Sequence, residues 1–133
     1  MKIPATLILS ILSFSFYAQT EIDYTNSGNA KAAMANYKEA IDDYTKAIEL
    51  NPKYYKAYNN RGTCYGSLQE YKAAIADYTK VIELNPQDAK AYFNRGYAKF
   101  EIQDMQNACL DWAMANELGK PEAAGLITKY CKQ

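Results

Sequence analysis

Residues 55–86 read YKAYNNRGTCYGSLQEYKAAIADYTKVIELNP, and most of this stretch recurs both earlier and later in the chain. The recurrence has a step of 34 residues, which separates Gly28 from Gly62 and Gly62 from Gly96. Three further series keep the same step: Tyr24, Tyr58 and Tyr92; Ala40, Ala74 and Ala108; and Tyr44, Tyr78 and Trp112. A fixed period of this length is typical of an array of stacked helical units.

Each unit is predicted to contain two helices, because its apolar residues follow a helical spacing. In the quoted unit these helices span residues 55–68 and 71–84, and the short break between them favours an antiparallel pair. Asn85-Pro86 then ends the second helix, since the residue before a proline is disfavoured in the helical region. Three such pairs are expected, over residues 21–50, 55–84 and 89–118.

The small and aromatic series are interpreted as packing positions of the scaffold: Gly28, Gly62, Gly96, Ala40, Ala74, Ala108, Tyr44, Tyr78 and Trp112. A glycine inside a helix costs about 1 kcal/mol relative to alanine, so a close contact between helices has to compensate for it. We expect Gly62 of the first helix to meet Ala74 of the second, with Tyr78 filling the next layer.

One position of the repeat is always an aspartate: Asp43, Asp77 and Asp111. We expect Arg61 and Arg95 each to pair with the aspartate of the same unit. The first unit has Ser27 in place of the arginine, which leaves Asp43 without an equivalent partner. Whole units, or about 20 Å, separate the aspartates, which is too far for one metal ion or one catalytic step. No metal site is therefore predicted.

The composition excludes several classes of function. The chain has 133 residues, the size of one small domain, with 15 basic residues, 15 acidic residues and no histidine. A net charge of zero argues against binding to nucleic acid. Without histidine there is no Ser-His-Asp triad, Cys-His pair or HExxH zinc site. We therefore predict a protein that is not an enzyme, has no catalytic residues and uses no cofactor.

Residues 1–19 differ from the repeat units and have the pattern of a secretory signal peptide. Lys2 precedes an apolar run from Ile3 to Phe16, and Ala18-Gln19 is a candidate cleavage point. A retained anchor is the alternative, but about 14 apolar residues are fewer than the roughly 20 that span a bilayer. The pattern predicts export to the periplasm or the exterior of a bacterial cell, with no integral membrane segment after cleavage.

Export would place the three cysteines in an oxidising compartment, where disulfides form. Cys109 takes the place of Ile41 and Ile75 in the earlier units, and Cys131 lies near the end of a final apolar helix that folds back over the third unit. We hypothesise a disulfide between Cys109 and Cys131, worth about 3 kcal/mol from loop closure. The alternative is that both are buried free thiols. Cys64 is expected to be a core residue.

The run Ala57-Tyr58-Asn59-Asn60-Arg61-Gly62, followed by Tyr65, Tyr71, Ala74, Tyr78 and Pro86, resembles the tetratricopeptide repeat. The resemblance covers three units, 21–54, 55–88 and 89–122, and extends to small exported bacterial members of the family. It implies an all-α protein built as a right-handed α-solenoid of three antiparallel helix pairs. Residues 122–133 would form a C-terminal capping helix, because the last unit otherwise exposes its stacking face.

Proteins similar to this one bind extended peptides or partner helices in a concave groove formed by their first helices. The matching positions in this chain are Thr25, Asn29, Lys56, Asn59, Asn60, Thr63, Lys90, Phe93, Asn94 and Tyr97. The resemblance therefore implies a non-catalytic scaffold for a protein or peptide partner. Two alternatives stay open: these residues form only a solvated surface, or the array is a structural or self-assembling part of an envelope complex. Neither the partner nor the oligomeric state is predicted.

A sharper alternative is a carboxylate-clamp co-chaperone, which holds the acidic C-terminal peptide of a partner. Asn29, Asn60 and Lys90 match the clamp by position. Thr25 and Asn94 stand where the clamp has a lysine and an arginine, so two of the cations that bind carboxylates are missing. We regard the clamp as the less favoured reading of the groove.

Overall fold

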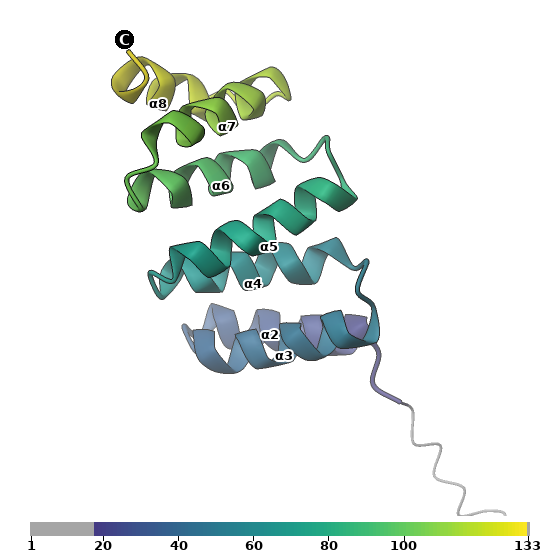
Figure 1. The fold of residues 1–133 in the computed structure, drawn as a ribbon. Helices are drawn as coiled ribbons and strands as arrows, with labels where there is room; N and C mark the ends of the chain where they lie inside the picture. Colours follow the sequence, from purple (N-terminus) through teal and green to yellow (C-terminus); the bar gives the residue numbers. More distant parts are fainter. Residues whose placement is uncertain (1–17, 133) are drawn as a thin grey trace, which may run out of the picture.

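The computed structural model describes residues 18–132 of the chain. These residues form seven α-helices and no strand (Figure 1): α2 (Glu21–Ala33), α3 (Tyr37–Leu50), α4 (Tyr55–Ser67), α5 (Tyr71–Leu84), α6 (Ala89–Glu101), α7 (Met105–Glu117) and α8 (Glu122–Tyr130). The predicted signal peptide falls almost entirely on residues 1–17, which lie outside the described residues. Within the described range, no helix combines the length and the apolar character needed to cross a membrane.

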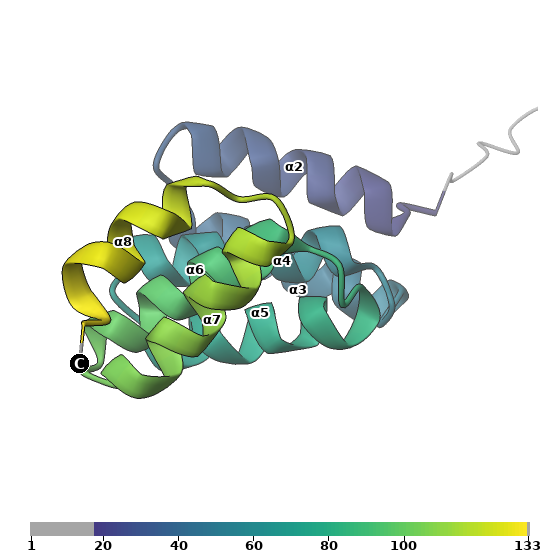
Figure 2. The same ribbon diagram turned by 90° about the horizontal axis from the view of Figure 1, so that it is seen from above.

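The helices pair as α2–α3, α4–α5 and α6–α7, and the pairs stack in chain order with α8 against the last one (Figure 1). The α-solenoid predicted from the repeat is therefore confirmed. In the middle unit, α4 and α5 match the predicted helices over 55–68 and 71–84 to within one residue. Figure 2 looks down the stack from above, with α8 packed beside α7.

The turn within each antiparallel pair contains one residue in the left-handed backbone conformation. This residue recurs with the period of the repeat, at Ala35, Gln69 and Gln103, where φ is 60°, 60° and 66°. In the middle unit the next backbone N–H, that of Glu70, donates to the carbonyl of Tyr65 at 2.8 Å. This bond satisfies a carbonyl that the end of α4 leaves without a helical partner. The chain can therefore reverse its direction between two helices within three residues.

An aromatic ring lies against each repeat glycine. A Cβ atom at Gly62 would lie 3.1 Å from Cε1 and 3.2 Å from Cζ of Tyr78, and 3.3 Å from the Cβ of Asp77. The ring of Tyr78 therefore lies nearest to Gly62, and the contact with Ala74 stays a prediction; its equivalent is present in the third unit, where a Cβ at Gly96 would lie 3.1 Å from the carbonyl oxygen of Ala108. The other units have the same contact, with predicted Cβ distances of 2.6 Å from Gly28 to Tyr44 and 2.7 Å from Gly96 to Trp112.

The arginine–aspartate pairs predicted within the units are present. Arg61 donates to both carboxylate oxygens of Asp77 at 2.9 and 2.8 Å. Arg95 holds Asp111 in the same way at 2.8 and 2.7 Å. Each arginine also donates to a threonine of the preceding unit: Arg61 to Thr45 and Arg95 to Thr79. These side chains therefore join neighbouring units as well as the two helices of one unit.

The expectation that Asp43 lacks a comparable partner is wrong. Lys31 Nζ lies 2.6 Å from Asp43 Oδ2, and the hydroxyl of Ser27 donates to the same oxygen at 2.6 Å. Lys31 lies one helical turn after Ser27, so its long side chain reaches the carboxylate that arginine reaches in the other units. The third unit also has a lysine at this position, and Lys99 lies 2.8 Å from Asp111.

Helix α8 packs on the stacking face of the last unit, as the capping prediction requires. Ala123 of α8 is fully buried, and Leu126 and Ile127 pack against the same core cluster. The ring of Tyr130 lies 4.7 Å from that of Phe100 and 6.3 Å from that of Trp112, centroid to centroid. Tyr130 of the cap therefore packs against two aromatic residues of the third unit, Phe100 and Trp112.

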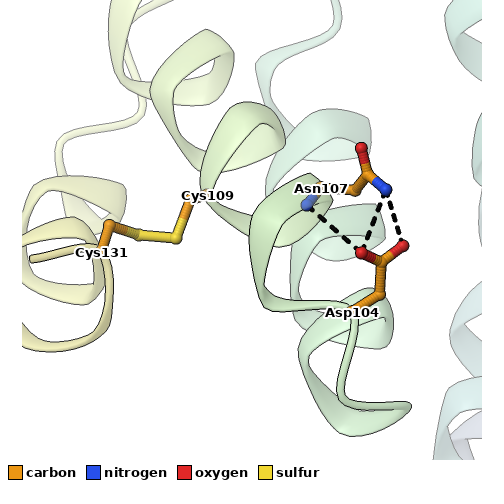
Figure 3. Close-up of a disulfide and its surroundings, with 4 residues drawn as sticks. All are labelled: Asp104, Asn107, Cys109 and Cys131. Carbon is orange, nitrogen blue, oxygen red and sulfur yellow. Dashed lines mark hydrogen bonds between the residues drawn. A yellow bond between two sulfur atoms is a disulfide. The ribbon is translucent and has the colours of Figure 1, made fainter. Parts of the chain in front are cut away.

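The two cysteines proposed to pair come from α7 and from the residue that follows α8. Figure 3 shows Cys109 and Cys131 directed toward each other, with their sulfur atoms 2.11 Å apart and their Cα atoms 5.8 Å apart. Nearby, Asp104 caps the N-terminus of α7 and accepts hydrogen bonds from the backbone and side-chain nitrogens of Asn107. Cys64 is unpaired and buried in α4, in the core position predicted for it.

Candidate functional site

Three adjoining hollows cross the first helices of the units, α2, α4 and α6. The N-terminal hollow, of about 270 Å³, is lined by Thr25, Asn29, Lys56, Asn59, Asn60 and Asp88 among others. The central hollow, of about 380 Å³, includes Asn29, Ala32, Tyr44, Asn59, Thr63 and Lys90. The aromatic hollow, of about 390 Å³, includes Gly66, Tyr71, Tyr78, Phe93, Asn94 and Tyr97. Because neighbouring hollows share residues, we call the three together the groove.

The structure places all ten predicted groove residues along this groove. Nine of them are exposed or half-buried, so a partner can reach their side chains. Thr25 is the exception, because only 4% of its surface is exposed and its hydroxyl donates to the carbonyl of Glu21. Thr25 therefore shapes the wall of the N-terminal hollow and offers no hydroxyl to a partner.

A chain of amide hydrogen bonds links the first two units across the groove. The oxygen of Asn29 accepts from the Tyr44 hydroxyl and from the amide of Asn60, both at 2.8 Å. The amide nitrogen of Asn59 donates to the oxygen of Asn60 at 3.4 Å. At the end of this chain, the buried side-chain oxygen of Asn59 has no hydrogen-bond partner within residues 18–132. This oxygen has almost no accessible surface, so an incoming donor does not reach it in this conformation.

Burial disfavours the ionised forms of three groups in the groove walls, Tyr44, Tyr78 and Cys64. Burial raises the pKa of Tyr44 to about 12, so its hydroxyl remains a donor to Asn29. Burial also raises the pKa of Tyr78, whose hydroxyl lies 3.2 Å from that of Thr63. Burial raises the pKa of the Cys64 thiol, which also lines the central hollow, and this disfavours the reactive thiolate.

Formal charge in the groove is sparse. Lys56 and Lys90 are exposed, and the carboxylate of Asp88 lies in the same N-terminal hollow as Lys56. Within the described range there is no group of three residues that could hold a metal ion. The groove is therefore suited to hydrogen bonding and apolar contact, with a small excess of positive charge.

Several groove residues were not among the sequence-based candidates. Asp88, Tyr54 and Tyr55 complete the N-terminal hollow, and Gly66 and Tyr71 complete the aromatic hollow. The candidates came from matched positions on the first helices, whereas Tyr71 begins a second helix and Asp88 and Tyr54 precede a first one. Comparing each residue with its equivalents in the other units would have singled out Gly66, which aligns with Ala32 and Phe100.

The fold and the groove together define a stack of antiparallel helix pairs with a continuous groove across the first helices. The chain belongs to the tetratricopeptide repeat family: family models match residues 23–54 and 55–88, and a further one matches residues 77–124. No curated protein matches the chain at a significant level.

Solved structures of tetratricopeptide repeat domains are similar to this chain over most of its length. The first TPR of Spaghetti (RPAP3), bound to the HSP90 peptide SRMEEVD, is 30% identical with a TM-score of 0.81, over 85% of this chain and 91% of that one. The second TPR domain of human RPAP3, in complex with the HSP70 peptide SGPTIEEVD, is 27% identical with a TM-score of 0.79, over 85% and 96%. The Arabidopsis OM64 TPR domain is 27% identical with a TM-score of 0.78, over 83% and 92%.

Proposed function

We propose that this protein is a non-catalytic scaffold that binds an extended segment of a partner protein in the groove. The observation that carries the proposal is the continuity of the three hollows, which together contain all ten of the matched first-helix residues. Two of the similar TPR domains are bound to short peptides, which supports peptide binding by this chain as well.

The amide groups of the groove suit a peptide backbone in particular. An asparagine side chain can donate and accept at once, as the backbone of an extended peptide does. The half-buried side chains of Asn59 and Asn60 line both polar hollows, where such a backbone would run. Lys90, exposed at the edge of the central hollow, adds a cation that favours a neutral or acidic segment.

Selection from a random peptide library displayed on phage, with the exported protein immobilised, tests the proposal. The wild-type protein is expected to enrich binding peptides. Asn60→Ala with Lys90→Ala should weaken the best of them about tenfold or more, because an amide bond and a charged contact are lost. Lys38→Ala with Asn116→Ala removes the same residue types from exposed positions outside the groove and should leave affinity unchanged. Equal losses in both variants, with unchanged melting, would contradict the proposal.

We further propose that the protein is exported and that Cys109 and Cys131 are oxidised in the mature form. The leader pattern of residues 1–19 supports export, and the Cα separation of 5.8 Å between Cys109 and Cys131 lies in the range that a disulfide requires. Protein purified from the exported fraction is expected to take up one alkyl group in denaturant without reductant, at Cys64. Mass spectrometry measures the number of labels, and three labels would contradict the oxidised pair.

A further inference from the structure

The aromatic hollow can be compared with the central hollow, because the two lie at equivalent places in consecutive units of the repeat. The wall from the second helix is the same in both, with Tyr37 and Tyr44 of the central hollow matched by Tyr71 and Tyr78. The wall from the following first helix differs: Asn59 and Thr63 are replaced by Phe93 and Tyr97. The two volumes are close, at about 380 and 390 Å³. The aromatic character is therefore a property of this one hollow and not of the repeat.

Gly66 leaves room in the wall of the aromatic hollow. A Cβ atom at Gly66 would have no other atom within 4 Å, in contrast to the close contacts at the repeat glycines. The equivalent residue of the third unit is Phe100, whose ring packs 5.7 Å from Trp112 and 4.7 Å from Tyr130. The third unit thus fills this position with an aromatic side chain, whereas the middle unit leaves it open toward the groove.

The walls of the aromatic hollow favour an apolar occupant. No charged side chain within the described range lines it, and Tyr97 remains 49% exposed at its edge. The Thr63 and Tyr78 hydroxyls lie 3.2 Å apart and hydrogen-bond to each other, so part of the polar lining is already satisfied. Covering aromatic surface of this kind with an apolar group is favourable, and a volume of about 390 Å³ is at the lower end of the range for small-ligand pockets.

We propose that the aromatic hollow is a specificity pocket that receives one large apolar side chain, aromatic or leucine-like, from the peptide segment bound in the groove. This inference rests on the proposed function. Thr63 and Ser67 line both the central and the aromatic hollows, so a segment lying along the amide groups continues directly into the pocket. The polar N-terminal hollow lies at the other end of the groove, so the apolar anchor of the segment lies at the third unit.

Gly66→Leu tests the pocket, because a Cβ atom at Gly66 meets no other atom within 4 Å and the rest of the leucine adds bulk to the wall of the hollow. Gly125→Leu in α8 is the matched control, since a Cβ atom at Gly125 also meets nothing within 4 Å and Gly125 does not line the hollow. Wild-type protein is expected to enrich phage peptides with a large apolar residue at one fixed position. Gly66→Leu should weaken the best such peptide about 10- to 100-fold, as expected for one buried large apolar side chain. Gly125→Leu should bind as the wild type does.

Replacing the apolar anchor of that peptide with alanine separates the pocket from the groove as a whole. The anchor-free peptide should bind wild type and Gly66→Leu equally, because the leucine then removes nothing further. If the selected peptides lose affinity on Asn60→Ala with Lys90→Ala but not on Gly66→Leu, the pocket is overturned and the proposed function stands. Failure of the wild type to enrich any peptide would overturn both. If light scattering showed that the wild type is a dimer and that Gly66→Leu is a monomer, the pocket would bind a second copy of the chain, and the proposal would be overturned.

Discussion

Asp111→Ala is expected to lower the free energy of unfolding by about 3–5 kcal/mol, because it leaves two buried cations without their counter-charge. Arg95 and Lys99 both bind this carboxylate, at 2.7 and 2.8 Å, and their side chains are only 16% and 17% exposed. Neither side chain is free to move fully into water while the units stay packed. Urea unfolding followed by circular dichroism measures the change.

Asp43→Ala is the matched comparison, because Asp43 holds the same position in the first unit. Its partner Lys31 is 38% exposed, so the ammonium can turn into solvent once the carboxylate is gone. The loss should therefore be clearly smaller than for Asp111→Ala. Equal losses at Asp43 and Asp111 would show that packing of the aspartate, and not the stranded charge, sets the cost.

Thr25→Lys combined with Asn94→Arg is expected to tighten binding of the peptide SRMEEVD, found on the first TPR of Spaghetti, by about 100-fold. The two substitutions supply the cations that the carboxylate clamp has and this chain lacks. Asn29, Asn60 and Lys90 already stand at the other clamp positions and line the same groove. Isothermal titration calorimetry at low salt measures the gain, because screening weakens exposed charge pairs.

Thr25→Gln with Asn94→Gln controls for side-chain length, since it adds no charge. An amidated peptide controls for the terminal carboxylate and should lose most of the gain. If the charged variant folds normally yet binds the free-acid peptide no better than the glutamine variant does, the clamp positions have been assigned to the wrong residues. The wild-type chain would then have to bind its partner without any relation to the clamp.

The period of 34 residues was sufficient to predict the helices, because apolar spacing and Asn-Pro boundaries depend on nearby residues. The conformation of the turns was not predictable in this way. Gln69 and Ala35 adopt positive φ although neither is a glycine, so no turn residue marks the reversal in the sequence. The capping helix was also predictable, since α8 carries the apolar residues that the last unit needs.

Contacts between side chains were harder to predict, because they depend on length and direction as well as on repeat position. Gly62 was expected against Ala74, and the atoms nearest to it belong to the larger ring of Tyr78. Lys31 was not recognised as the partner of Asp43, because it lies one turn away from the position that arginine uses. The pocket at Gly66 depends on a missing side chain, which becomes visible only when the three units are compared position by position.

We expect the partner segment to bind on the first helices and not on the outer faces of the units. Amide chemical shifts of labelled protein, recorded by NMR as a selected peptide is added, test it most directly. We predict the largest shifts in α2, α4 and α6, with the side-chain amides of Asn59 and Asn60 among them. Shifts concentrated in α3, α5 and α7 would contradict the account.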